Sequence, residues 1–200
     1  MLTLRKIAVT GGLSSGKSSV CRILKNLGAY VVSADEVVHQ LFSHPKLKQK
    51  LVELLGNEVI VKDQIDRSKV AAKVFSDPNL LEALEKLIHP LVYREILRQY
   101  RIQAGKKTPP TLFVAEIPLL FESGGDKIFS FSVAVITDKE RCFERFHQLT
   151  DMDWEEFNKR AGRQLPQEEK ARLATCTIEN NGSLQELCPK VENLYKHLSN

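Results

Sequence analysis

The stretch GGLSSGKSS at residues 11–19 combines glycines, a lysine and several serine hydroxyls. A strand that ends in a glycine-rich turn and restarts as a helix directs backbone N–H groups and a helix N-terminus at one point, which favours a phosphate. The spacing of Gly11, Gly16, Lys17 and Ser18 fits the phosphate-binding P-loop pattern. In that pattern the loop wraps a triphosphate, Lys17 reaches the outer phosphates and the Ser18 hydroxyl binds Mg²⁺.

A plainer interpretation of the same stretch is a Gly/Ser turn with a surface lysine. That alternative leaves unexplained why the turn joins the apolar run at residues 7–10 to a helical pattern at Val20, Ile23, Leu24 and Leu27. We therefore favour the P-loop, because it requires a strand before the loop and a helix after it.

Two carboxylates, Asp35 and Glu116, come at or just after predicted strands. Ligands of parallel sheets gather at the carboxyl ends of strands, so we expect Lys17, Asp35 and Glu116 to face one crevice. Phosphoryl transfer to a hydroxyl needs a group that orients the hydroxyl and accepts its proton, and Asp35 suits that task. The alternative role for Asp35 is to cap the helix that starts at Glu36, and the two roles are compatible.

Five of the chain's eleven arginines lie between residues 141 and 172. A loose phosphoryl transition state spreads negative charge over its oxygens, and guanidinium groups on a closing lid stabilise such charge. Acidic residues are equally frequent in this segment, so the alternative for any single arginine is a solvated, salt-bridged helix face.

Apolar runs and helical patterns alternate along the chain. After the strand that leads into the loop, further strands are predicted at residues 29–35, 111–122, 129–138 and 176–178. Asp66 and Asp138 are each expected to cap the helix that follows, and Asp153 forms a capping box with Glu156. Pro90 lies inside a long helical pattern and is expected to kink it, because proline cannot donate to the carbonyl four residues earlier.

Strands that alternate with helices predict one α/β domain of the P-loop NTPase fold, with a parallel sheet covered by helices. We expect a core of residues 1–35, 105–138 and 174–200. Residues 36–104 are expected to form a mostly helical insert for the substrate, and residues 139–173 a mobile lid that carries the arginines. A length of 200 residues suits one domain with modest inserts.

Composition limits the partners. The net charge is +4, from 29 basic and 25 acidic residues, without the one-signed block that tracks along nucleic acid. Small anionic substrates fit this balance, and no nucleic acid is expected. The four cysteines show no CxxC spacing and are expected to be reduced. The N-terminus enters a strand directly and no apolar stretch could cross a bilayer, so we expect a cytoplasmic monomer or small homo-oligomer without a membrane partner.

Several stretches, in their order along the chain, resemble the dephospho-CoA kinase family. They are TGGLSSGKSS, SAD, IDRSKVAAKVF, LEKLIHPLV, IPLLFE, RQLPQEEKARLA and IENNG, and together they cover nearly the whole chain. The stretches LEKLIHPLV and IPLLFE are the most diagnostic, because very many unrelated NTPases share a P-loop alone.

The resemblance implies that the γ-phosphate of ATP passes to the ribose 3′-hydroxyl of dephospho-CoA, the last step of coenzyme A synthesis, with Mg²⁺ required. It implies that Lys17, Asp35 and Arg145 are catalytic, with Asp35 as the base and Arg145 in reach of the transferred phosphoryl group. Asn180 would lie near the adenine.

The resemblance also implies the binding residues. ATP would be held by Gly11, Gly12, Leu13, Ser14, Ser15, Gly16, Lys17, Ser18 and Ser19, with Ser18 as the metal ligand. The acceptor site would be shaped by Asp35, His89, Pro90, Pro118 and Leu119.

This chain departs from the family pattern at Ser33 and Thr175, where the family usually has acidic residues, and at Leu149, where it has a second lid arginine. The candidates to replace that arginine are Arg141, Arg160 and Arg163. None of the three departures alters the loop or the predicted base, so we expect activity.

Two other functions remain as alternatives. A nucleoside monophosphate kinase would share the lid and crevice, but the HPLV and IPLLFE stretches argue against it. A nucleotide-dependent switch would hydrolyse ATP without an acceptor, and the sequence holds no NKxD-like guanine-reading stretch.

Overall fold

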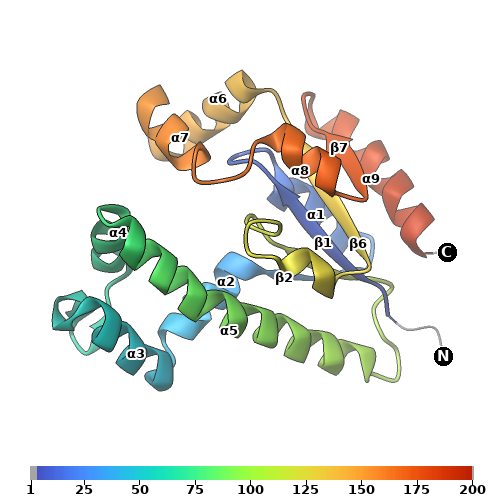
Figure 1. Ribbon diagram of the computed structural model, residues 1–200. Helices are drawn as coiled ribbons and strands as arrows, with labels where there is room; N and C mark the ends of the chain where they lie inside the picture. Colours follow the sequence, from blue (N-terminus) through green and yellow to red (C-terminus); the bar gives the residue numbers. More distant parts are fainter. Residues whose placement is uncertain (1–3, 200) are drawn as a thin grey trace. The chain divides into compact units, whose positions relative to one another are not determined.

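The central sheet has five parallel strands in the order β2, β5, β1, β6, β7 in the computed structural model, which describes residues 4–199 (Figure 1). Their bounds are β1 Lys6–Gly11, β2 Tyr30–Ser33, β5 Phe113–Glu116, β6 Phe131–Ile136 and β7 Cys176–Glu179. Strand β1 lies in the middle, because Val9 is paired in register with Glu116 on one side and Val133 on the other. This order confirms the predicted parallel α/β fold.

Helices connect these strands. They are α1 Lys17–Asn26, α2 Ala34–Phe42, α3 Pro45–Leu55, α4 Arg67–Phe75, α5 Pro78–Ala104, α6 Lys139–Thr150, α7 Trp154–Ala161, α8 Gln167–Leu173 and α9 Leu184–Ser199. Two 3-10 turns, η1 Asn57–Val59 and η2 Gly125–Ile128, and a small antiparallel hairpin of β3 Ile60–Val61 and β4 Gln64–Ile65 complete the described elements.

Ala34–Arg98 form one compact unit, which we call the helical unit, and the rest of the chain forms the other, the nucleotide unit. The predicted insert at residues 36–104 overlaps the helical unit, but the boundary lies inside α5. The first boundary has no loop, since β2 ends at Ser33 and α2 begins at Ala34.

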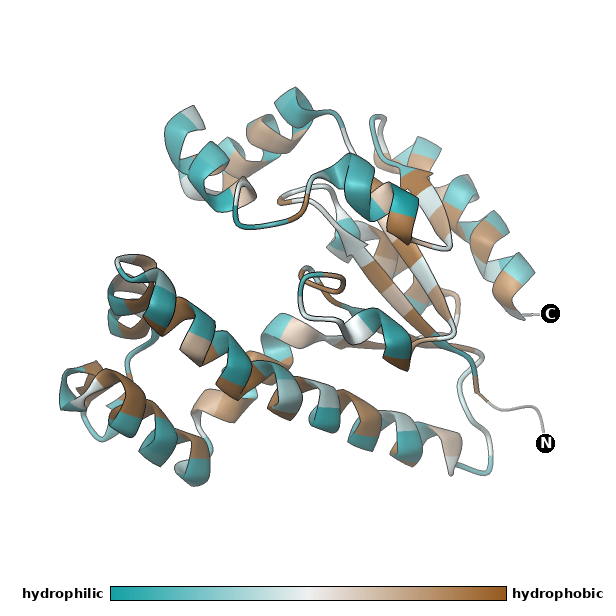
Figure 2. Cartoon of the chain, in the orientation of Figure 1, coloured by the Kyte–Doolittle hydropathy of each residue, from teal (hydrophilic) through white to brown (hydrophobic). Residues whose placement is uncertain are grey.

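The nucleotide unit is built around the sheet. Helices α1 and α9 pack on each other, and α1 packs on β1, β2 and β5, while α8 packs on β1 and β6. Consecutive residues of β1 are fully buried whichever face they point to, as expected of a covered parallel strand. Figure 2 shows the resulting hydrophobic colouring along the strands. The core that the strands form with α1 and α9 includes Ile7, Val9, Val20, Leu24, Val133, Val135 and Val191.

The helical unit buries one apolar stripe from each of its helices and leaves its charges at the surface. The buried residues include Leu47, Leu51 and Leu55 of α3, Val70 and Val74 of α4, and Leu84, Ile88 and Val92 of α5. The spacing of four residues places these side chains on one face of each helix.

The capping predictions had mixed outcomes. Asp66 caps α4 by accepting from the N–H groups of Ser68 and Lys69, at 2.9 and 3.1 Å, which confirms the prediction. Asp153 likewise accepts from Glu156 N at 2.9 Å at the start of α7, but the Glu156 carboxylate, the other half of the predicted capping box, bonds Arg160 instead. The Asp138 side chain does not cap α6, because it accepts from the amide of Asn181 instead.

The strand predicted at residues 111–122 is shorter than expected. Strand β5 ends at Glu116, and turns follow it. Ile117 still donates to Val9 O at 2.9 Å, but Pro118 has no N–H with which to continue the ladder. The apolar run IPLLF therefore reflects a buried turn rather than a strand.

Candidate active site

The P-loop is the turn between β1 and α1, and its glycines are required by close contacts. Gly11 has φ +148°, and a Cβ there would lie 2.3 Å from Val135 O. Gly16, the N-cap of α1, has φ +91°, and its Cβ would lie 2.1 Å from Asn180 Nδ2. A larger residue would press on the Val135 backbone at position 11 and on the Asn180 side chain at position 16. The backbone conformations at both positions also favour glycine.

The side chain of Lys17 lies against the loop itself. Its Nζ donates to Gly12 O at 2.7 Å and to Gly11 O at 3.2 Å, and the residue is only 8 % exposed. The lysine charge is therefore held within the turn of the loop, where a ligand phosphate would meet it.

Ser18 and Glu116 bring a hydroxyl and a carboxylate together beside the loop. The Ser18 hydroxyl donates to Glu116 Oε1 at 2.7 Å, so the end of β5 lies next to the start of α1. One turn further along α1, burial and then the charge of Glu116 raise the pKa of the Cys21 thiol well above its usual value, with Lys17 opposing. Cys21 is thus a neutral packing residue behind this pair.

The carbonyl of Ser15 receives donors from three other segments. Asn180 Nδ2 donates to it at 2.8 Å, Thr137 Oγ1 at 2.9 Å and Arg145 Nη1 at 3.4 Å. Arg145 also donates through Nη2 to Asn180 O at 2.9 Å. The structure therefore brings two predicted site residues, Arg145 and Asn180, to the Ser15 carbonyl of the P-loop.

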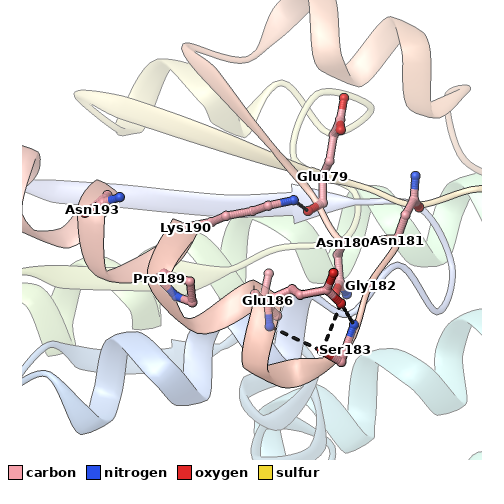
Figure 3. A pocket seen from close by; sticks show the side chains of 10 residues that line it. Glu179, Asn180, Asn181, Gly182, Ser183, Glu186, Pro189, Lys190 and Asn193 are labelled. Atoms are coloured by element: carbon pink, nitrogen blue, oxygen red, sulfur yellow. Dashed lines mark hydrogen bonds between the residues drawn. The ribbon is translucent and has the colours of Figure 1, made fainter.

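The loop after β7 lines a pocket of about 580 Å³ with the start of α9 (Figure 3). Glu186 accepts from the backbone N–H and hydroxyl of Ser183, at 2.7 and 2.9 Å, and Lys190 donates to Glu179 O at 2.9 Å. These bonds hold the loop that carries Asn180. The hydrogen bonds of Glu186 with Ser183 keep the pKa of its carboxyl low.

A buried ion pair anchors α8 to the turn after β5. Lys170 is fully buried, and its Nζ donates to Pro118 O at 2.6 Å and pairs with Glu122 Oε1 at 2.9 Å. Glu122 also accepts from Leu165 N, and Thr10 Oγ1 donates to Pro118 O. Burial lowers the pKa of Lys170, and Glu122 opposes that shift. Pro118, predicted to shape the acceptor site, is thus fixed from two sides.

Sequence comparisons identify relatives along the whole chain. The family model described as dephospho-CoA kinase matches residues 5–186. The dephospho-CoA kinase of Protochlamydia amoebophila is 49 % identical over 199 residues, which cover 99 % of this chain and 98 % of the relative.

The chain belongs to the dephospho-CoA kinase family.

Solved structures agree with this assignment. TT1252 from Thermus thermophilus aligns with a TM-score of 0.82 and 32 % identity, covering 98 % of both chains. The dephospho-CoA kinase of Campylobacter jejuni aligns with a TM-score of 0.72 and 26 % identity, covering 97 % of this chain and 96 % of its own. The fold of this family member is that of a P-loop kinase.

Asp35 and His89, two residues to which the resemblance to dephospho-CoA kinases assigns a role, both lie in the helical unit. Asp35 is in the first turn of α2, which begins at Ala34, so it does not occupy the capping position considered for it. His89 and Pro90 lie inside α5, which runs through the proline. Burial lowers the pKa of His89, with Glu85 opposing, so the imidazole is neutral near pH 7. The roles of these residues stay predictions.

The arginines of the predicted lid have different surroundings. Arg160 donates to Glu156 at 2.8 Å on the same face of α7, the salt-bridged arrangement considered as an alternative. Leu149, where the family usually has an arginine, is 82 % exposed at the end of α6. An aromatic cluster of Phe143, Phe146, Trp154 and Phe157 joins α6 to α7. Since α8 is anchored to the sheet, we propose α6 and α7 alone as the lid.

Sequence reasoning missed Thr137 and the Glu122–Lys170 pair. Thr137 directly follows β6, so the rule that ligands gather at the carboxyl ends of strands could have singled it out. The ion pair joins residues far apart in the chain and left no local signal. Within residues 4–199, no group of three or more acidic, histidine or cysteine side chains could hold a metal, and no helix is long and apolar enough to span a membrane.

Proposed function

We propose that the protein transfers the γ-phosphoryl group of ATP to the ribose 3′-hydroxyl of dephospho-CoA, giving coenzyme A and ADP. The observation that carries the proposal is the P-loop with Lys17 inside its turn and Ser18 beside Glu116 in a member of this family. In the transfer, the 3′-oxygen forms a bond to the γ-phosphorus, and the bond from that phosphorus to the bridging oxygen of ADP breaks. The hydroxyl proton leaves to a base.

Mg²⁺ fits the residues present. The hydroxyl of Ser18 and the carboxylate of Glu116, 2.7 Å apart, are the hard oxygen donors that Mg²⁺ prefers. Few protein ligands are needed, because Mg²⁺ at such sites is held mainly by phosphate oxygens and water. When bound, the ion neutralises charge on the β- and γ-phosphates. We therefore add Glu116 to Ser18 as a metal-site residue.

Lys17 and the loop provide positioning and charge. Backbone N–H groups of residues 11–19 would hold the phosphates, and the Lys17 ammonium would stabilise the charge that the outer phosphate oxygens gain in the transition state. Catalysis of this kind requires little covalent chemistry from the protein, so the accuracy of the loop geometry decides the rate.

Asp35 is proposed as the base. A ribose hydroxyl has a pKa far above neutrality, so the carboxylate acts by aligning the hydroxyl and taking its proton late in the transfer. The helical unit would provide the surface for the acceptor, with His89 and Pro90 from α5, and Pro118 and Leu119 would contribute from the turn after β5. A neutral His89 could donate or accept a hydrogen bond without adding charge.

We further propose ATP as the nucleotide, with Asn180 near the adenine, and a cytoplasmic monomer or small homo-oligomer that does not bind nucleic acid. All four cysteines are free thiols, which fits a reducing compartment. The mild positive charge of +4 fits anionic small substrates.

An acceptor panel tests the function. With ATP and Mg²⁺, dephospho-CoA should be phosphorylated far faster than adenosine, AMP or shikimate, which lack the pantetheine arm. Mass spectrometry of the product should place the new phosphate on the 3′-oxygen. Equal rates with AMP would favour a nucleoside monophosphate kinase, and ATP hydrolysis that ignores dephospho-CoA would favour a switch.

A further inference from the structure

The Ser15 carbonyl is the most heavily bonded backbone oxygen of the P-loop in the described part of the chain. Its donors come from the end of β6, from α6 and from the end of β7. Thr137 and Asn180 are 2 % and 6 % exposed and Ser15 is fully buried, so water does not compete for these bonds. One carbonyl thus receives donors from three distant segments.

Fixing a carbonyl also fixes the N–H of the same peptide. The described chain contains no cis peptide bonds, so the Ser15 C=O and the Gly16 N–H point in opposite directions. Donors that hold the Ser15 carbonyl therefore also hold the Gly16 N–H on the opposite side of the peptide, and the P-loop pattern directs backbone N–H groups of this loop at the phosphates.

We propose that Thr137, Asn180 and Arg145 are positioning residues that lock the Ser15–Gly16 peptide with its N–H directed at the phosphate chain of ATP. This inference rests on the proposed ATP site, and it gives Arg145 a role through the loop rather than contact with the transferred phosphoryl group.

Two further observations fit this lock. Gly16 is the residue whose Cβ would reach Asn180 Nδ2 at 2.1 Å, so the glycine is what allows the amide to approach the carbonyl. The guanidinium of Arg145 also bonds Asn180 O, which holds the asparagine in place. Donors on a carbonyl polarise the peptide and strengthen the hydrogen bond that its N–H makes. Both effects favour an anion bound at the Gly16 N–H.

The test separates the phosphates from the adenine. Inhibition constants against ATP are measured for inorganic tripolyphosphate, which has no base, and for adenosine, which has no phosphate. Thr137→Val keeps the shape of the side chain and removes its donor. We expect this variant to bind ATP and tripolyphosphate about tenfold more weakly and adenosine as tightly as the parent does. Thr137→Ser should restore the parental affinities.

Ser132→Ala is the matched control. Ser132 is also buried and lies on β6, but its hydroxyl bonds Thr175 rather than the loop, so tripolyphosphate inhibition should not change. Asn180→Ala provides a second variant should Thr137→Val unfold, as checked by thermal unfolding, and should also weaken tripolyphosphate.

The proposal is overturned if tripolyphosphate binds Thr137→Val and Asn180→Ala as well as it binds the parent, or if adenosine alone is weakened, because the residues would then act on the base. A parent protein that binds neither ATP nor tripolyphosphate would overturn the proposed ATP site itself.

Discussion

The P-loop and the helical unit are held in place by different interactions. The loop is fixed by buried, directional hydrogen bonds, such as those from Thr137 and Asn180 to Ser15 O. The helical unit is fixed by apolar side chains, and its ion pairs, such as Lys48 with Asp63, lie at the surface, where the Asp63 side chain is 94 % exposed.

The difference fits the role that we propose for each region. Hydrophobic burial is non-directional and brings elements together without aiming any atom. A hydrogen bond depends steeply on angle, so several of them can aim one peptide N–H. The proposed site for small, compact phosphates needs directional hydrogen bonds, whereas the proposed surface for a long, flexible acceptor can be built by hydrophobic burial.

The largest expected effect lies in the loop. Lys17→Ala removes the charge proposed to face the outer phosphates in a partly dry site, so we expect the rate to fall by up to ~10³-fold, the upper end for loss of one electrostatic donor. Circular dichroism and thermal unfolding should show an intact fold. Unchanged turnover in a coupled assay would refute the P-loop assignment.

Next in size is the ion pair of α8. Lys170→Met leaves Glu122 partly buried without its partner, which should lower the free energy of unfolding by about 3 kcal/mol, as for other broken buried pairs. Lys48→Met in the helical unit is the matched control and should cost less than about 1 kcal/mol, since exposed pairs contribute little. Urea unfolding measures both. Equal losses would contradict the contrast between the two regions.

Asp35→Asn tests the helical unit's contribution to chemistry. It keeps the size of the side chain and removes its basicity, so kcat should fall at least ~10²-fold, the low end for general base catalysis. Affinities for ATP and dephospho-CoA should stay close to those of the parent. A variant with parental kcat would mean that the base has been misassigned.

Arg145→Ala distinguishes loop positioning from transition-state contact. Because the guanidinium bonds two carbonyls beside the loop, we expect the KM for ATP to rise about tenfold, with a smaller fall in kcat. A fall confined to kcat would instead indicate contact with the transferred phosphoryl group. Arg160→Ala and Arg163→Ala, measured alongside, show whether either residue replaces the arginine that the family usually has at position 149.

The smallest effect is expected at the cap of α4. Asp66→Ala removes the acceptor for two backbone N–H groups and should lower stability by about 1 kcal/mol. Asp66→Asn retains a capping oxygen and should lose much less. Neither change should alter the KM for ATP, and an altered value would contradict the separate roles given to the two units.

Structural features that depend on residues close together in the sequence could be predicted from the sequence. The P-loop between a strand and a helix, the parallel sheet and the caps at Asp66 and Asp153 all follow from local patterns, and the structure confirms them. The Asp138 side chain does not cap α6, because its carboxylate accepts a hydrogen bond from the amide of Asn181, which is distant in the sequence. Local rules cannot foresee such competition.

The candidate site was predictable only in part, for the same reason. Lys17 and Ser18 lie in one short motif, whereas Thr137 and Asn180 are 122 and 165 positions away from the carbonyl they bond. No spacing rule connects residues so far apart. The shortened strand β5 has a similar cause, since its end is set by pairing with β1 and by Pro118.

The strand order has a consequence for how a new chain emerges from the ribosome. Within residues 4–199, β1 pairs with β5 and β6, and β2 pairs with β5, so neither strand has a sheet partner until β5, which begins at Phe113, has been made. Ala34–Arg98, by contrast, are contiguous and have all their mutual contacts available early. Segments fold as they are synthesised, N-terminal parts first, once their contacts exist. Asn180 lies 165 positions after Ser15, so its hydrogen bond to the P-loop forms only after that residue has been synthesised.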